Sequence, residues 1–195
     1  MTDRAFRVIE TLCSICGVSG REQNIGMKAA EMLRAYIPDA ACHDGLVTAS
    51  LGNDAGKPNL LFCAHMDQVG FLVTDITEDG FLRIGAVGGI DHRLLLGQPV
   101  TVQGKQGSLH GVISILPPHL LKGEQAVPED AQLCVDLGMD SAAALESLVS
   151  RGDAVYYGTL PRQLQNGLVT APALDNRCGV AALIRAAELL SEEKD

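Results

Sequence analysis

The sequence predicts an α/β domain that is interrupted by a small inserted β domain. Two observations support this prediction. Apolar residues recur at helical spacing near both ends of the chain, whereas the middle carries short β-rich runs separated by turn signals such as Glu78-Asp79-Gly80. We therefore expect residues 1–69 and 164–195 to form an α/β domain, with a β-barrel domain inserted at residues 70–163.

The N-terminal segment predicts two helices. The first covers residues 3–16 and is followed by Gly17, which is placed to end it. Its apolar stripe consists of Phe6, Ile9, Leu12, Cys13 and Cys16. Ser19 and Glu22 have the spacing of a capping box, so we expect the serine hydroxyl to cap a second helix that stops near Pro38.

Strand signals flank the inserted domain. Leu46–Leu51 lies between two glycines, and Asn59–Ala64 contains a continuous apolar run, which is typical of a strand buried on both faces of a helix-covered sheet. Strand signal returns at Leu168–Ala171 and is followed by a final amphipathic helix. The apolar stripe of that helix consists of Val180, Leu183, Ile184, Ala187 and Leu190.

Six β-rich runs and one helix are expected within the inserted domain. The runs are Gly70–Ile76, Phe81–Ile84, Pro99–Gln103, Gly111–Leu116, Leu133–Asp136 and Ala154–Tyr157, and the helix is Ser141–Val149. Short strands separated by turns in this way are typical of a small barrel or a sandwich.

Charge and composition restrict the classes of function. The net charge is -9, so the phosphates of a nucleic acid or an anionic membrane surface would be repelled. No stretch is long and apolar enough to span a bilayer, and the N-terminus lacks the apolar core of a signal peptide. We expect a cytoplasmic protein that does not bind nucleic acid or membranes.

The six cysteines fit a reducing compartment. Cys13 and Cys16 form a C-x-x-C pair, but the pair closes a helix instead of opening one, and no second pair with zinc-site spacing follows. We favour small buried apolar residues over metal or redox chemistry for both.

His65 and Asp67 form a candidate site at the end of the apolar run. The carboxyl ends of strands in open α/β sheets are where ligands bind, and neutral imidazole is a common zinc ligand. Asp67 could orient the ring or tune a metal from behind it. The alternative is a strand-end histidine that is hydrogen-bonded to its neighbour.

Asp175 is the second candidate and lies directly before the final helix. Aspartate is a preferred N-cap residue, so capping competes with metal binding as its role. His65 and Asp175, however, each follow an element that flanks the inserted domain, so the two residues are candidates for one site. A carboxylate that bridges two metal ions about 3.5–4 Å apart is an arrangement found in aminopeptidases.

Six segments, in order, resemble the N-terminal portion of the M42 metallo-aminopeptidases, a family that includes glutamyl aminopeptidases and tetrahedral dodecameric aminopeptidases. The segments are Gly17–Glu22, Ala64–Phe71, Val87–Asp91, Gly111–Ile113 with Pro117–Leu120, Val135–Gly138 and Ala173–Gly179. They cover nearly the whole chain. The resemblance implies a zinc-peptidase-like α/β catalytic domain, incomplete here, with an inserted β-barrel domain used for assembly.

The resemblance also implies a mechanism and partners. His65 would bind one metal, Asp175 would bridge two divalent ions (zinc or cobalt), and Asp67 would be the catalytic acid that orients His65. The activity would be removal of N-terminal residues from peptides by a metal-activated water, with a glutamate as general base. The chain would form a homo-oligomer through the β domain.

The family's glutamate pair, a further acidic ligand and a final histidine find no match in these 195 residues. Glu192-Glu193 is not a substitute, because neighbouring side chains on a helix point about 100° apart and the family's pair follows a later strand. We therefore expect the chain alone to be truncated and inactive.

Two other functions compete with this one. The first is a non-catalytic, self-associating module built on residues 70–163. The second is a glycoside hydrolase, which we rank last because sugar grooves are usually lined with aromatic residues and the chain has 4% aromatics and no tryptophan.

Overall fold

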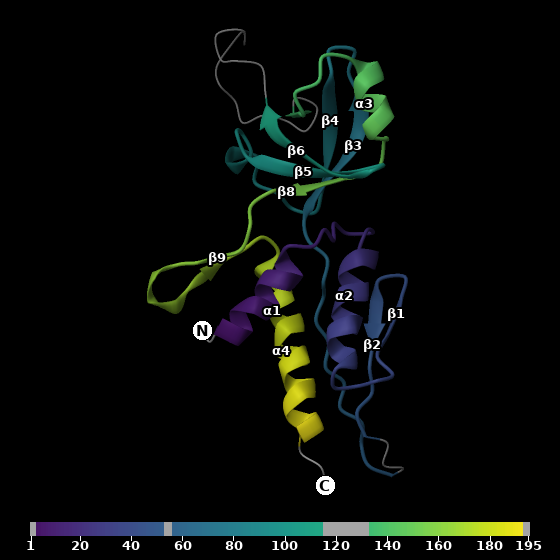
Figure 1. The fold of residues 1–195 in the computed structure, drawn as a ribbon, viewed down its shortest axis with the longest axis vertical. Helices are drawn as coiled ribbons and strands as arrows, with labels where there is room; N and C mark the ends of the chain where they lie inside the picture. Colours follow the sequence, from purple (N-terminus) through teal and green to yellow (C-terminus); the bar gives the residue numbers. More distant parts are fainter. Residues whose placement is uncertain (1–2, 53–55, 115–132, 193–195) are drawn as a thin grey trace. The chain divides into compact units, whose positions relative to one another are not determined.

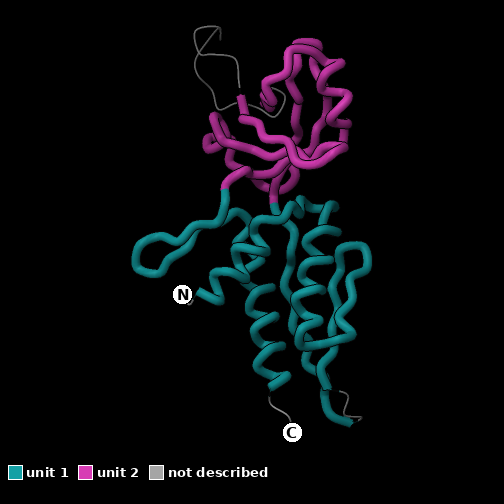
Figure 2. Tube along the Cα trace, in the orientation of Figure 1, with its two compact units in different colours: residues 1–68, 160–195 teal, residues 69–159 magenta. Residues whose placement is uncertain are grey.

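The computed structural model describes residues 3–52, 56–114 and 133–192. The chain forms two compact units, coloured separately in Figure 2. We call residues 1–68 and 160–195 the helical unit and residues 69–159 the barrel unit. Each is described by itself.

The described residues of the helical unit form three α-helices, a short 3-10 helix, η4 (Gln165–Gly167), and two short hairpins (Figure 1). The elements are α1 (Asp3–Cys13), α2 (Gln23–Arg34), β1 (Ala41–His43), β2 (Leu46–Thr48), β9 (Arg162–Gln163), β10 (Val169–Thr170) and α4 (Leu174–Glu192). The helices contact one another, and apolar residues from all three meet in a core. That core consists of Leu12, Ile25, Ala29, Val180 and Ile184. The predicted stripes at the two ends of the chain therefore pack together because both are apolar at helical spacing.

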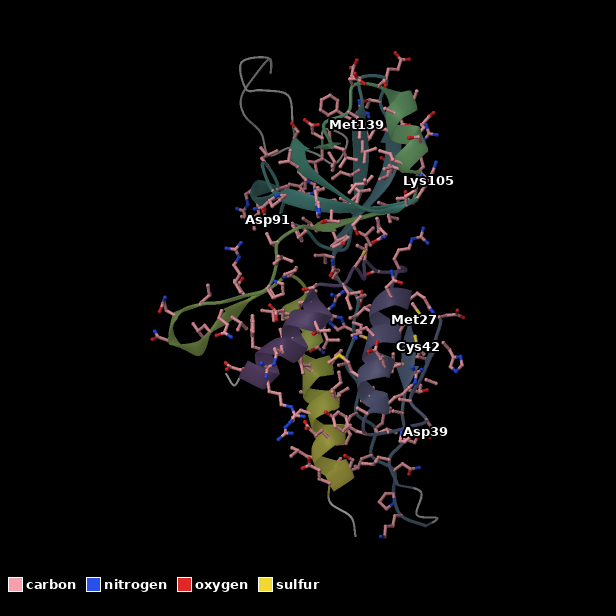
Figure 3. The ribbon with its side chains drawn as sticks, viewed as in Figure 1. Met27, Asp39, Cys42, Asp91, Lys105 and Met139 are labelled. Atoms are coloured by element: carbon pink, nitrogen blue, oxygen red, sulfur yellow. The ribbon has the colours of Figure 1, made fainter. Side chains whose placement is uncertain are left out.

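Helix α2 lies close against the β1–β2 hairpin, and Gly26 allows this approach. A Cβ atom at Gly26 would stand only 2.8 Å from the Cys42 sulfur and 2.8 Å from the Gly45 carbonyl oxygen. Figure 3 labels Met27 on α2 and Cys42 on β1 at this junction. The hairpin covers one side of α2, so the unit gains a second layer there.

The barrel unit is a closed barrel of six strands in the order β3-β4-β7-β6-β5-β8, and every neighbouring pair is antiparallel. The strands are β3 (Gly70–Ile76), β4 (Phe81–Val87), β5 (Pro99–Gly104), β6 (Gly107–Ser114), β7 (Cys134–Asp136) and β8 (Ala154–Tyr157). The described residues of this unit also form a short 3-10 helix, η1 (His92–Leu94), and α3 (Ala142–Leu148). The expected runs and the helix are found within a few residues of their predicted bounds.

Apolar side chains on alternate strand positions fill the barrel. Phe71 and Val73 on β3 and Leu82 and Ile84 on β4 are all buried, with a more exposed residue between each pair. Val135 on β7, which is paired with Leu82 on the neighbouring strand β4, belongs to the same buried cluster. Closing the sheet removes its edges, which is how a small sheet avoids leaving backbone groups unpaired.

Two local predictions were wrong. Asn59–Ala64 forms neither a helix nor a strand, and no strand in the described residues pairs with it. Leu60, Leu61 and Phe62 are 81%, 91% and 68% exposed. A run of consecutive apolar residues needs neighbours on both edges and both faces, and in the described part of the chain these are missing.

The predicted capping box at the start of the second helix is the other wrong prediction. Helix α2 begins at Gln23 after Glu22, with no side-chain bond to its first turn. The Glu22 carboxylate accepts from the Gly20 backbone N–H at 2.6 Å, and the Ser19 hydroxyl bonds elsewhere. Glutamate satisfies a backbone donor in this turn, so the serine is free for another partner.

Two predicted features lie outside the described residues: the Pro117–Leu120 segment with His119, and Glu193. Among the helices that are described, none combines the length and apolar character that a bilayer crossing requires.

Candidate metal centre

His65 and Asp175 are 110 positions apart in the sequence and lie in contact. His65 Nε2 is 3.1 Å from Asp175 Oδ1. His65 directly follows the apolar run Asn59–Ala64, and Asp175 lies in the first turn of α4. Both side chains are open to solvent, with 54% of the His65 side chain and 96% of the Asp175 side chain exposed. Both belong to the helical unit.

Asp67 holds the other side of the imidazole. Its Oδ1 atom is 3.0 Å from His65 Nδ1. When Nδ1 carries the ring proton and donates it to Asp67, the Nε2 lone pair is directed at the Asp175 carboxylate. Two acceptors then face each other across 3.1 Å, an arrangement that a shared proton or a shared cation would stabilise.

Ser19 is part of this site, although sequence reasoning assigned it to a helix cap. Its hydroxyl donates to Asp67 Oδ2 at 2.5 Å, so each oxygen of Asp67 has its own partner. This hydrogen bond, and to a smaller extent the bond and charge of His65, hold the pKa of Asp67 below its usual value against the opposing effect of burial. Asp67 is therefore kept as a carboxylate.

Asp175 does not cap the final helix. The following residue does so instead, because Asn176 Oδ1 accepts from the Gly179 backbone N–H at 3.1 Å. Asp175 itself has non-helical backbone angles (φ -89, ψ 105), and the peptide bond between these two residues is cis. Capping therefore does not compete with metal binding for the Asp175 carboxylate, whose Oδ1 atom contacts His65 instead.

Arg177 holds the backbone next to His65 and Asp67, and the sequence did not predict a role for it. It is completely buried, and its guanidinium donates to the carbonyl oxygens of Met66 at 3.0 Å, Leu12 at 2.7 Å and Ile15 at 2.6 Å. A Cβ atom at Gly17 would stand 2.6 Å from Arg177 Nη2, so a glycine there leaves room for the cation. Burial lowers the pKa of Arg177.

The donor set suits a divalent metal but is partial. Imidazole nitrogen and carboxylate oxygen are ligands of zinc and related ions. Within the residues that the structure describes, no group of three or more histidine, cysteine, aspartate or glutamate side chains is arranged to hold an ion. Glu192 cannot contribute, because it lies at the far end of α4, about 25 Å along the axis at 1.5 Å per residue. His65 and Asp175 would be part of a larger ligand set.

Comparison with known proteins gives a consistent family assignment. The family model for M42 glutamyl aminopeptidase matches residues 45–195. The glutamyl aminopeptidase of Lactococcus lactis is 28% identical to this chain, over 97% of the chain and 56% of its own length. The chain spans about half the length of the curated relatives it matches.

Solved structures of related peptidases also match this chain. An aminopeptidase from the archaeon Desulfurococcus kamchatkensis superposes with a TM-score of 0.89 at 31% identity, covering 95% of this chain and 52% of that one. The TET1 peptidase of Pyrococcus horikoshii, which can assemble into a tetrahedron or a large octahedral shell, gives 0.86 at 35% identity, covering 96% and 57%. With the closed barrel, these matches confirm the predicted fold class.

Proposed function

From the membership of this chain in the M42 glutamyl aminopeptidase family, which the ordered segments predicted, we propose that it supplies the first part of a dinuclear metal centre. That centre would remove N-terminal residues from peptides. The observation that carries the proposal is the 3.1 Å approach of His65 Nε2 to Asp175 Oδ1, with Asp67 on the opposite ring nitrogen. A ligand, a bridge and an orienting acid are three of the parts that such a site needs.

Each residue has a separate role in this proposal. His65 binds one ion through Nε2, and Asp67 keeps the ring in the required orientation by accepting from Nδ1. Asp175 would be the residue that holds both ions, zinc or cobalt, and the cap of α4 is supplied by Asn176 instead. When bound, the ions supply an activated water nucleophile at neutral pH. The general base would come from outside these 195 residues.

The chain on its own would therefore have little or no peptidase activity. Two ligand side chains would hold two catalytic metal ions only weakly. The described residues contain no group of three or more potential ligands. A polypeptide of the length of the relatives would complete the site. A non-catalytic role in assembly remains the second candidate. It is supported by the TET1 peptidase relative, which can assemble into a tetrahedron or a large octahedral shell. In that case the barrel unit would self-associate.

Zinc titration of the isolated chain tests the proposed site. Isothermal titration calorimetry should detect weak binding that is lost in His65→Ala and in Asp175→Ala. His43→Ala is the matched control, because His43 lies exposed on β1 and contacts neither residue of the site. Equal zinc binding by His65→Ala and the wild type would overturn the proposal.

A further inference from the structure

The Gly17–Ser19 segment runs beside the residues that follow His65. The Gln68 backbone N–H donates to the Gly17 carbonyl oxygen at 2.8 Å, and the Ser19 backbone N–H donates to the Gln68 carbonyl oxygen at 3.3 Å. Val18 and Gln68 form a parallel bridge. The backbone of Ser19 is therefore held by the residue directly after Asp67, and its hydroxyl reaches the Asp67 carboxylate.

The backbone between His65 and Asp67 is held as well. Arg177 Nε donates to the Met66 carbonyl oxygen at 3.0 Å, and Arg177 is itself anchored to the end of α1 through two carbonyl oxygens. With the main chain held from both sides, rotation of the side chains is the main remaining freedom at the site. Asp67 is 38% exposed, so packing alone does not fix its carboxylate.

We propose that Ser19 is a positioning residue, which holds the Asp67 carboxylate in the one orientation that can accept from His65 Nδ1. The inference rests on the proposed function, because orienting His65 matters only if Nε2 binds an ion. The geometry is the 2.5 Å bond from Ser19 Oγ to Asp67 Oδ2 combined with the 3.0 Å contact between Asp67 Oδ1 and His65 Nδ1. Two partners on two oxygens define the plane of a carboxylate, whereas one partner allows it to swing.

No competing role accounts for the Ser19 hydroxyl. The first turn of α2 has no side-chain cap, and the Gly20 N–H that a local turn would use is bonded to Glu22. The hydroxyl donates its single proton to the Asp67 carboxylate. Partners that orient a metal ligand from behind are typically worth a ten- to hundredfold change in metal affinity.

Four variants of the 195-residue chain test the inference. Ser19→Ala removes the hydroxyl, and Ser19→Thr retains it. Ser19→Val has the shape of threonine without the donor, so the Thr and Val pair decides the outcome even if the alanine variant folds poorly. Ser14→Ala is the control, since Ser14 is exposed directly after α1 and its hydroxyl donates back to the Glu10 carbonyl oxygen at 2.7 Å.

Two readouts are needed, and the first requires no metal. Crystal structures of the variants should show Asp67 and the His65 ring in one conformation in the wild type, Ser19→Thr and Ser14→Ala. They should show a rotated or split Asp67 side chain in Ser19→Ala and Ser19→Val. Thermal midpoints are measured beside the structures, because a merely structural serine would lower the midpoint without rotating the Asp67 side chain.

The second readout is the affinity for Zn²⁺ alone, measured by calorimetry. We expect it to be about ten- to hundredfold weaker in Ser19→Ala and Ser19→Val and within about twofold of the wild type in Ser19→Thr. Unchanged Asp67 conformation in both hydroxyl-free variants would overturn the inference. If the wild type binds no zinc through His65, the proposed function fails, and the metal-free structures still decide the role of Ser19.

Discussion

The Arg177 guanidinium donates a hydrogen bond from Nε to the Met66 carbonyl oxygen at 3.0 Å. Met66 separates His65 from Asp67, and Arg177 lies two residues after Asp175 at the start of α4. One buried side chain therefore ties the backbone of the first site segment to the helix that carries the second. The contact between His65 and Asp175 is a consequence of this tie as much as of the side chains themselves.

Loss of this buried cation should destabilise the helical unit. Arg177→Met keeps most of the side-chain volume but removes the charged donor from the carbonyl oxygens of Leu12, Ile15 and Met66. We expect the free energy of unfolding to fall by about 3 kcal/mol or more in urea denaturation, since hydrogen bonds to charged groups are worth about 1.5–3 kcal/mol each.

Arg185→Met is the control for that measurement. Arg185 is 53% exposed and pairs with Glu188, which retains Arg4 as a partner. Its loss should cost no more than about 1 kcal/mol. Equal destabilisation by the two substitutions would contradict the role given to Arg177.

Peptidase activity should require more chain than these 195 residues. With zinc or cobalt added, the isolated chain should give little or no turnover of aminoacyl-nitroanilides, because the general base and most ligands are missing. A longer chain with the length of the relatives should be active, and His65→Ala or Asp175→Ala should abolish that activity. Robust turnover by the short chain would refute the argument that the site is partial.

The isolated chain should self-associate or aggregate. Leu60, Leu61 and Phe62 are largely exposed and consecutive, and a contiguous apolar surface drives association. Sedimentation velocity should detect oligomers, and Leu61→Lys should reduce them. Leu46→Lys, at a residue that is 68% exposed on β2, should have less effect because its apolar surroundings are smaller. A well-behaved wild-type monomer with a cooperative thermal transition would count against this prediction.

Asp91 on the barrel unit, labelled in Figure 3, should stay ionised in acid. Arg93 donates from Nε to Asp91 Oδ1 at 2.8 Å and from Nη2 to Oδ2 at 2.5 Å, and these bonds lower the pKa of Asp91 to about 2. A carboxylate with a lowered pKa in the folded state stabilises the fold above the pKa of the unfolded chain, about 3.9, and loses this effect as the pH falls through about 2.

The thermal midpoint tests the direction of this pH dependence. Asp91→Asn should melt below the wild type at pH 5, and the difference should shrink toward zero as the pH approaches 2. The effect will be small, because both side chains are exposed and screened by solvent. A difference that grew on acidification would mean that the pKa of Asp91 is raised instead.

Local patterns were sufficient to predict the barrel and much of the helical unit. Alternating burial along β3 and β4 follows from a period of two, and the stripes of α1 and α4 follow from a period of 3.6. The short spacing between His65 and Asp67 also predicted their contact, because two residues that close can meet whatever the rest of the chain does.

Local patterns failed where a side chain had two possible partners. Ser19 and Glu22 match a capping box, yet the Ser19 hydroxyl bonds Asp67, which is 48 positions away. Asp175 looks like a helix cap, yet the next residue caps α4. In each case the side chain contacts a partner that is distant in the sequence, and no spacing rule records such a contact.

The amino-acid order was enough to establish the family, the barrel and the candidate ligands His65 and Asp175, because periodicity and motif order are properties of the chain alone. Their 3.1 Å approach, the burial of Arg177 and the exposure of Leu60–Phe62 depended on folding. Such contacts join segments that are more than a hundred residues apart or require neighbours that the local sequence does not supply. They exist only once the helices have packed and the backbone near His65 is held in place.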